Sequence, residues 1–270
     1  MPRPLNGYKN AAGSAIPGVT DITGRFMDRS RIIWWAFNRG KQGHPKLYDD
    51  SALDIGTAVH MMAEMDLRDQ PDDDIEFYLQ ATLREPEHRQ KAATSFAAWR
   101  AWRAQFHVEA HAQEASLVSE TLQYGGTLDI VAKVRNSLAL IDIKTTSTGE
   151  VYEDHLLQLV AYGILWEETH PGEMLGSYHL ILLPKDGGAF IHREYSPALL
   201  QPYRSKFWLY RKAIELESRT CDPKVMAGIG VTPSPAPTQR RKRALKTAPT
   251  AAPAPTMADI LRTYGHVRVA

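Results

Sequence analysis

Apolar and polar positions follow two periods along this chain, one typical of helices and one typical of strands. Spacings of three and four residues predict helices that cover 25–41 after a cap at Thr20 or Asp21, and then 51–67, 91–106, 151–168 and 197–217. Alternation with a period of two predicts strands over 110–122, 127–134, 138–145, 178–184 and 189–195. We therefore expect helices and strands to share one core, behind an extended entry segment at residues 1–20.

Aromatic side chains mark two of these helices. The first carries Phe26, Ile33, Trp34 and Phe37 at helical spacing, and we expect them to be core rather than a platform for stacking bases. The helix over 91–106 carries an aromatic stripe that should pack on the sheet. Between the helices, residues 69–90 begin with an acidic loop and break near Pro86.

Turn signals separate the strands. The residues Tyr124-Gly125-Gly126 are typical of a turn or bulge, Arg135-Asn136-Ser137 closes a short hairpin, and 185–188 closes another. Alternation in the next two strands predicts two sets that each share one face, Thr127, Asp129, Val131 and Lys133 in the first, and Leu138, Leu140, Asp142 and Lys144 in the second.

Composition is that of a globular protein with room for one large domain, with 270 residues of which 43% are hydrophobic and 23% charged. No apolar run approaches the roughly 20 residues that span a bilayer, and the amino terminus lacks a secretory pattern, which predicts a cytoplasmic protein. The single Cys221 excludes an internal disulfide framework and a four-cysteine zinc or iron–sulfur site formed by one chain.

Charge is distributed unevenly behind the formal net charge of +1. Residues 224–270 carry eight Lys or Arg side chains against Asp259, so the remainder is acidic. We expect 223–256 to be a basic linker rich in Pro, Ala and Thr, followed by a short segment at 257–270. The RRKR run at 240–243 predicts either contacts with nucleic acid phosphates or a charged segment that only aids solubility, and the sequence does not decide between the two. The adjacent carboxylates of Asp72–Asp74 are expected to cap a helix rather than bind a metal.

Candidate chemistry gathers at the central hairpin. Asp142 and Lys144 share a strand face, and the preceding strand can bring Asp129 beside them. Two carboxylates that converge require a shared proton, a basic side chain or a cation, and oxygen ligands favour Mg²⁺ or Mn²⁺. A lysine beside such a metal can orient a water molecule or stabilise a scissile phosphate. The alternative is that both aspartates end strands at the surface and pair with Lys133 or Lys144.

Five motifs occur in a fixed order: GTAVH at 56–60, Glu114, GGTLD ending at Asp129, DIK at 142–144, and QLVAY at 158–162. This order resembles the PD-(D/E)XK nuclease superfamily, and within it the branch of the RecB nuclease domain, Cas4, the mitochondrial genome maintenance exonuclease and phage exonucleases. IPGVTDIT at 16–23 is similar to an opening motif of the mitochondrial enzyme's relatives. The resemblance covers roughly residues 15–215.

This resemblance implies an α/β (α+β) fold with a restriction-endonuclease-like core, in which helices flank a central mixed sheet. The nuclease domain would span 1–222, with a helical part at 20–107 and a catalytic core at 108–217. By resemblance, the metal ligands would be His60, Asp129, Asp142 and the backbone carbonyl of Ile143. The other site residues would be Lys144 on the attacking water, Glu114 or alternatively Glu120 as the upstream acidic group, and Gln158 and Tyr162 lining the site.

The function implied is a divalent-metal-dependent DNA exonuclease acting on linear single- or double-stranded ends, with Mg²⁺ or Mn²⁺ as cofactor. Its setting would be recombination, repair or end processing in the bacterial or phage-infected cytoplasm, with a single-strand annealing or recombination protein as candidate partner and no membrane. Iron–sulfur relatives use four cysteines, so no cluster is expected with Cys221 alone. The alternatives are a cluster-free end-processing nuclease of the Cas4 kind and a catalytically silent DNA-binding module.

Overall fold

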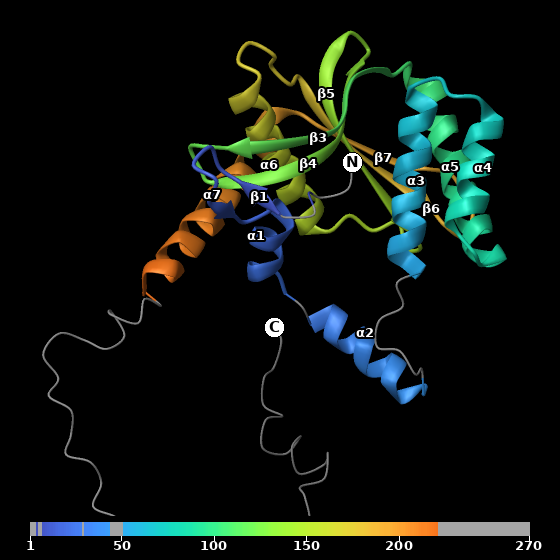
Figure 1. Cartoon of the computed structure of the whole chain (residues 1–270), viewed down its shortest axis with the longest axis horizontal. Coiled ribbons are helices and arrows are strands. Elements are labelled where there is room, and N and C mark those ends of the chain that lie inside the picture. Colours follow the sequence, from blue (N-terminus) through green and yellow to red (C-terminus); the bar gives the residue numbers. More distant parts are fainter. Residues whose placement is uncertain (1–3, 5–6, 29, 44–50, 221–270) are drawn as a thin grey trace, which may run out of the picture. The chain divides into compact units, whose positions relative to one another are not determined.

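A five-stranded mixed sheet forms the centre of the fold in this computed structural model, which describes residues 4, 7–28, 30–43 and 51–220. The strands lie in chain order, and only β5 and β6 pair in parallel. Their bounds are β3 (Glu109–Ser119), β4 (Tyr124–Val134), β5 (Ser137–Thr146), β6 (Ser177–Pro184) and β7 (Ile191–Tyr195) (Figure 1). The expected central mixed sheet is confirmed. Cys221 and the predicted segments 223–256 and 257–270 lie outside the described residues.

Helices cover both faces of this sheet. One buried apolar cluster joins it to α3 (Ser51–Leu67), α4 (Asp72–Thr82) and α5 (Pro86–Phe106). The other joins it to α1 (Val19–Phe26), α6 (Glu153–Thr169) and α7 (Pro197–Thr220) (Figure 1). Because parallel strands need a long crossover, α6 between β5 and β6 is required by the sheet topology. No described helix is long and apolar enough to cross a bilayer.

The β4–β5 hairpin forms as its sequence predicts. Its two turn residues, Arg135 and Asn136, have φ values of 50° and 70°. A two-residue turn with both φ values positive matches the right-handed twist of the strands, and asparagine tolerates this backbone region. The hairpin therefore sets the register that brings Ile130 opposite Ile141.

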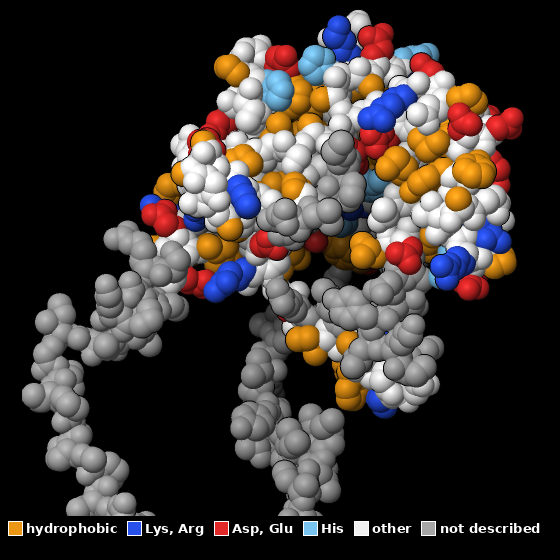
Figure 2. All heavy atoms as spheres, viewed as in Figure 1, with side chains coloured by type: hydrophobic (Ala, Val, Ile, Leu, Met, Phe, Trp, Pro, Cys, Tyr) orange, Lys and Arg blue, Asp and Glu red, His pale blue; other side chains and the backbone are white. Residues whose placement is uncertain are grey.

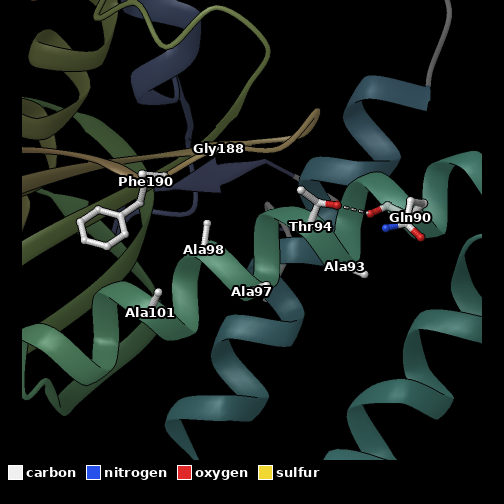
Figure 3. Close-up of a pocket in the computed structure, with 9 residues that line it drawn as sticks. Gln90, Ala93, Thr94, Ala97, Ala98, Ala101, Gly188 and Phe190 are labelled. Atoms are coloured by element: carbon white, nitrogen blue, oxygen red, sulfur yellow. Dashed lines mark hydrogen bonds between the residues drawn. The ribbon is translucent and has the colours of Figure 1, made fainter.

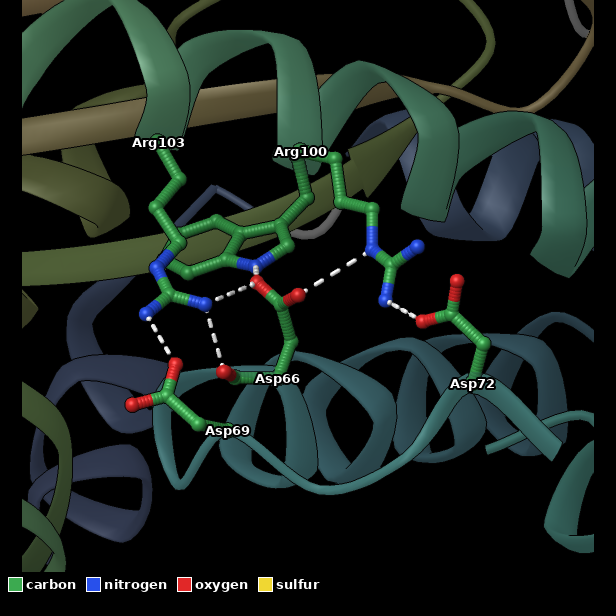
Figure 4. Close-up of polar contacts among 6 residues, drawn as sticks. Asp66, Asp69, Asp72, Arg100 and Arg103 are labelled. Atoms are coloured by element: carbon green, nitrogen blue, oxygen red, sulfur yellow. Dashed lines mark hydrogen bonds and ion pairs between the residues drawn. The ribbon is translucent and has the colours of Figure 1, made fainter. Parts of the chain in front are cut away.

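A charge network fastens α3 to α5 (Figure 4). The buried carboxylate of Asp66 accepts hydrogen bonds from Trp99 Nε1 at 2.9 Å and from Arg100 Nε at 3.0 Å. Arg103 lies 3.1 Å from the same carboxylate and donates to Asp69 at 2.9 Å, and Arg100 also pairs with Asp72. The helix that carries His60 is thereby held against the helix that packs on the sheet.

The first predicted helix is wrong in two respects. It is divided into α1 and α2 (Ser30–Lys41), because Met27 adopts extended backbone. Phe26 stacks on Tyr210 of α7 at 4.6 Å, but Ile33, Trp34 and Phe37 are 66%, 64% and 48% exposed. Figure 2 shows hydrophobic side chains at the surface of this region. Helical spacing indicates which side chains share a face, and it does not say whether that face meets a core.

Three further boundaries differ from the sequence predictions. Helix α5 begins at Pro86 and not at Lys91, because proline suits the first helical turn. Gly125 and Gly126 lie inside β4 and not in a turn, since Tyr8 packs so close that a Cβ at Gly125 would lie 2.3 Å from its ring. The entry segment also contains a small hairpin, β1 (Tyr8–Lys9) and β2 (Ala15–Ile16).

Candidate active site

The two central strands separate where their aspartates lie. The β4–β5 ladder ends at the pair Ile130 and Ile141, one position before Asp129 and Asp142. Instead of a strand partner, the Ile143 N–H has the carboxylate of Asp129 as its acceptor, with Oδ2 at 2.8 Å. Beyond this point β4 and β5 no longer pair, so the edge of β5 that faces β4 can bind side chains of a site in place of a strand.

Side-chain alternation in β4 breaks at the same place. Leu128 and Val131 both pack in the core under α6, whereas Ile130 packs in the core under α3 and α5. Strict alternation would place Leu128 and Val131 on opposite faces, so the predicted single face of Thr127, Asp129, Val131 and Lys133 is wrong. The break occurs at Asp129 and allows its carboxylate to reach α3.

His60 lies on α3 and faces oxygen atoms on both sides of its ring. Its Nε2 is 2.9 Å from the Ile143 carbonyl oxygen, and its Nδ1 is 3.4 Å from Asp129 Oδ1 and 4.0 Å from Glu114 Oε1. A carbonyl can only accept, so Nε2 donates to it. Burial lowers the pKa of His60, but the Asp129 charge and hydrogen bond outweigh it, and the net shift is upward.

Glu114 reaches this group through an unusual backbone. It lies in β3 between residues that pair with Ile130 and Leu128, and its φ is 47°. A positive φ is uncommon for a residue with a side chain, and here it accompanies the change in side-chain direction. Burial, then the neighbouring Asp129, raises the pKa of Glu114. Glu120, the alternative acidic residue, lies in the β3–β4 turn and accepts a hydrogen bond from the Ala11 amide.

One ligand atom each from His60, Glu114 and Asp129 lies within 4.8 Å of the others. Burial raises the pKa of Asp129, but His60, Lys144 and the Ile143 amide outweigh it and lower the pKa overall. Together with the Ile143 carbonyl, these groups present oxygen acceptors around one imidazole. Such a set fits a divalent cation, for which hard oxygen ligands and imidazole are ordinary partners.

Asp142 and Lys144 form a buried ion pair beside this cluster. Lys144 Nζ donates to Asp142 Oδ1 at 2.8 Å and lies 2.6 Å from Oδ2. Asp142 is 1% exposed, and burial raises its pKa to about 6 in spite of Lys144. Burial lowers the pKa of Lys144, but Asp142 and Asp129 outweigh it and raise the pKa overall. Asp142 pairs with Lys144, as the alternative interpretation supposed, but it does not end at the surface.

Helix α6 contributes Tyr162 to the same place. Tyr162 is buried, and burial followed by the nearby Asp142 and Asp129 raises its pKa well above the ordinary value. Gln158 lies one turn earlier on α6 and is half-buried, and it is not among the described residues that line the cleft. The resemblance implies that both residues line the site, whereas the structure has Tyr162 in the lining of the cleft and Gln158 outside it.

A cleft of about 760 Å³ joins these groups. Among its lining residues Lys144 is the one Lys or Arg, beside the acidic Glu64, Glu114 and Asp129. The lining also contains hydroxyl groups that the sequence prediction missed, those of Tyr8, Thr20, Thr57, Tyr78, Thr127 and Thr145. No local pattern marks them, because each of the six comes from a different helix or strand. The acidic residue Glu64 does have a local signal, because it follows His60 by one helical turn and therefore shares its helix face.

A second hollow, of about 540 Å³, lies between α5 and the β6–β7 turn (Figure 3). Its lining consists mainly of alanine side chains on α5, with Phe190 on the opposite side and Gln90 and Thr94 at one end. These lining residues include no titratable group. The cleft at His60 is therefore the better candidate for chemistry.

Comparison with known proteins gives a family match and several distant structural similarities. The family model of the PD-(D/E)XK nuclease superfamily matches residues 35–245. Comparison with curated proteins gives no match. A crystal structure of a protein from Eubacterium rectale, described as an exonuclease, is 11% identical with a TM-score of 0.48, and the match covers 85% of each chain.

Two crystal structures of an alkaline exonuclease from Laribacter hongkongensis are also similar. One is 13% identical with a TM-score of 0.30 and covers 46% of this chain and 68% of that one. The other, in complex with dAMP, is 14% identical with a TM-score of 0.33 and covers 58% of this chain and 88% of that one. Sequence identities and TM-scores as low as these carry no information about activity, and the family assignment rests on the family model.

Proposed function

Because the chain belongs to the PD-(D/E)XK nuclease superfamily, we propose that it is a divalent-metal-dependent DNA exonuclease with its active site in the cleft at His60. Nucleases of this superfamily use divalent metals and act on nucleic acid. The observation that carries the proposal is the convergence of His60, Glu114, Asp129 and the Ile143 carbonyl beside Lys144.

In this proposal the metal would be held by His60, Asp129 and the Ile143 carbonyl, with Glu114 supporting them, and His60 would first give up the proton that its Nε2 donates to that carbonyl. Asp142 is the further ligand that the resemblance implies, and one of its oxygens would bind the metal while the other stays paired with Lys144. The bound cation would neutralise the acidic cleft and polarise the scissile phosphate. An acidic lining repels a polyanion, so a cleft that takes DNA needs this positive charge.

Lys144 would act on the attacking water. Its ammonium group is held by Asp142 at the edge of the cleft and can orient that water or stabilise charge that develops on the phosphate. Tyr162 and the hydroxyl groups of the cleft would contact the DNA backbone, since neutral donors bind phosphate oxygens without adding repulsion.

The exonuclease hypothesis rests on the order of the five motifs, which is similar to the motif order of the branch that includes phage and mitochondrial exonucleases. A role in phage or bacterial recombination, repair or end processing follows from the same resemblance, and Mg²⁺ or Mn²⁺ is the cation we expect. A nuclease domain over 1–222, with a helical part at 20–107 and a catalytic core at 108–217, is also part of the proposal.

The deciding experiment uses the full-length protein and two substrates, linear DNA labelled at its 5′ or its 3′ end and closed circular DNA. Each substrate is incubated with Mg²⁺, with Mn²⁺ or with a chelator. We expect the protein to degrade linear DNA only when a divalent metal is present, and to leave closed circular DNA intact. Rapid nicking of circles contradicts exonuclease action, and cleavage in chelator contradicts the metal requirement. DNA binding without any cleavage would instead support the silent-module alternative.

Variants at two lysines provide the matched control. Lys144→Ala is expected to lower the cleavage rate about 100- to 10,000-fold, the range of a positioned proton-transfer group. Lys133→Ala makes the same change at an exposed position on the neighbouring strand and should leave the rate unchanged. Equal rates for the two variants would remove Lys144 from the mechanism.

A further inference from the structure

Three potential metal ligands lie at the β6–β7 edge of the sheet and take no part in the cleft. His179 of β6 pairs across the strands with Glu194 of β7, and His192 precedes Glu194 by two residues, so both β7 side chains share one face. Ligand atoms of His179, His192 and Glu194 all lie within 4.8 Å of one another. The three belong to two paired strands, which hold their spacing.

The surroundings fix the orientation of both imidazole rings. Ser177 Oγ lies 2.8 Å from His179 Nε2, which turns Nδ1 of that buried ring to His192 Nε2 at 2.7 Å. The His192 ring meets Phe106 edge-on at 4.5 Å and lies nearly parallel to the His179 ring. A metal-binding histidine usually donates the proton on its second nitrogen to an acceptor, and Ser177 Oγ can be that acceptor for His179 Nε2.

Each ring can offer a lone pair to a metal once its proton lies on the nitrogen that faces away from the other ring. The contact between the rings requires one shared proton. If the His179 proton moves to Nε2 and is donated to Ser177 Oγ, both facing nitrogens become free.

We propose that His179, His192 and Glu194 form a zinc site that is separate from the nuclease cleft. Two imidazoles and one carboxylate are a ligand set that suits Zn²⁺ and leaves a fourth position for water, whereas Mg²⁺ prefers oxygen ligands alone. Zinc bonds of about 2.1 Å set two nitrogen ligands about 3.4 Å apart in a tetrahedral site, so the rings must separate slightly from their present contact. The metal also competes with Arg135, whose Nη1 lies 3.5 Å from Glu194 Oε2.

The structural consequence is a clamp on the edge of the sheet. Strand β7 has five residues and pairs with β6 alone in the described sheet. A cation that takes ligands from both strands ties this short edge strand to its neighbour. This inference does not depend on the proposed nuclease activity, because no ligand of one site belongs to the other.

The test is a zinc titration of the full-length protein against a chromophoric chelator, in a His60→Ala background that weakens the cleft site. We expect one zinc ion per chain to remain bound, and Co²⁺ in its place to give the intense visible absorption of a tetrahedral site. Adding Glu194→Gln should weaken zinc binding by about 10- to 100-fold or more. Glu194 is exposed, so this variant should fold, and circular dichroism checks that it does.

Glu173→Gln in the same background is the matched control. Glu173 Oε2 pairs with His111 Nε2 at 2.9 Å at the surface, which offers a histidine and a carboxylate but is not one of the three-ligand groups found among the described residues. This control should bind zinc as tightly as the background. Absence of zinc from the background chain, or equal affinity with and without Glu194→Gln, overturns the proposal and leaves the two histidines as a hydrogen-bonded pair.

Discussion

Gly126→Ala tests the packing that sets Tyr162 in the cleft. A Cβ on Gly126 would lie 2.8 Å from Tyr162 Cε1, 2.9 Å from Leu165 Cδ1 and 2.9 Å from Val19 Cγ2. Carbon atoms in contact prefer about 3.5–4.0 Å, so the Tyr162 ring must move by at least about 0.7 Å. The added methyl group therefore both overpacks the core under α6 and displaces a side chain of the site.

The expected magnitudes follow from these distances. Overpacking of a dense core costs about 1–3 kcal/mol, which for a domain of this size lowers the Tm by roughly 2–12 °C. A displacement approaching 1 Å at a positioned group lowers a rate by on the order of 100-fold. We therefore expect a folded, less stable protein whose nuclease rate falls about 10- to 100-fold, if Tyr162 acts as proposed.

Thermal unfolding and cleavage of linear DNA measure the two effects, and Gly56→Ala is the control. Gly56 lines the same cleft from α3, and its nearest neighbour to a new Cβ is Thr145 Oγ1 at 3.4 Å, an ordinary contact. Alanine is favoured over glycine within a helix by roughly 0.5–1 kcal/mol, so this variant should keep or raise the Tm. A Gly126→Ala protein with unchanged Tm and rate would refute the packing of Tyr162, Leu165 and Val19 around this backbone.

Three other changes have defined outcomes. Glu114→Gln should lower both Mn²⁺ affinity and cleavage rate by about 10- to 100-fold while Glu120→Gln changes neither, as measured by titration and DNA cleavage; the opposite order would assign the acidic role to Glu120. Asp66→Asn should lower the free energy of unfolding in urea by about 1–3 kcal/mol, because two arginines lose a buried charge, and the exposed Asp69→Asn should cost less. Burial raises the pKa of Glu168, but hydrogen bonds from Ser119 and Thr121 outweigh it and lower the pKa overall. The stabilisation by this carboxylate is thus present above its ordinary pKa and lost as the pH falls below it, so Glu168→Gln should flatten the acid side of a pH–stability curve.

Local periodicity predicted the central hairpin, the β6–β7 hairpin and helices α3, α6 and α7. It succeeded there because each pattern is set within a few residues, as with the turn at Arg135 and Asn136. The same reasoning placed Asp142 and Lys144 together, since residues two apart in a strand share a face. His60 lies 69 residues before Asp129 along the chain, and only the family resemblance joined the two.

Other features depend on contacts that no local pattern encodes. The exposed Trp34 and Phe37 have the spacing of core residues, and what distinguishes them is that no surface among the described residues packs against them. Gly125 and Gly126 have the composition of a turn, yet they serve close approach of Tyr8 and Tyr162. The break of alternation at Asp129 follows from its bond to the Ile143 amide, which pairs residues 14 positions apart.

The backbone of Ile143 gives both of its polar groups to site side chains, its N–H to Asp129 and its carbonyl to His60. Its side chain only fills the core, where replacement by valine costs about 0.5–1.5 kcal/mol. A saturation mutagenesis screen would thus score position 143 as tolerant of other aliphatic residues, although its peptide groups stand at the centre of the site. Part of the proposed catalytic site thus consists of main-chain atoms, which a side-chain substitution does not remove and a sequence alignment does not show.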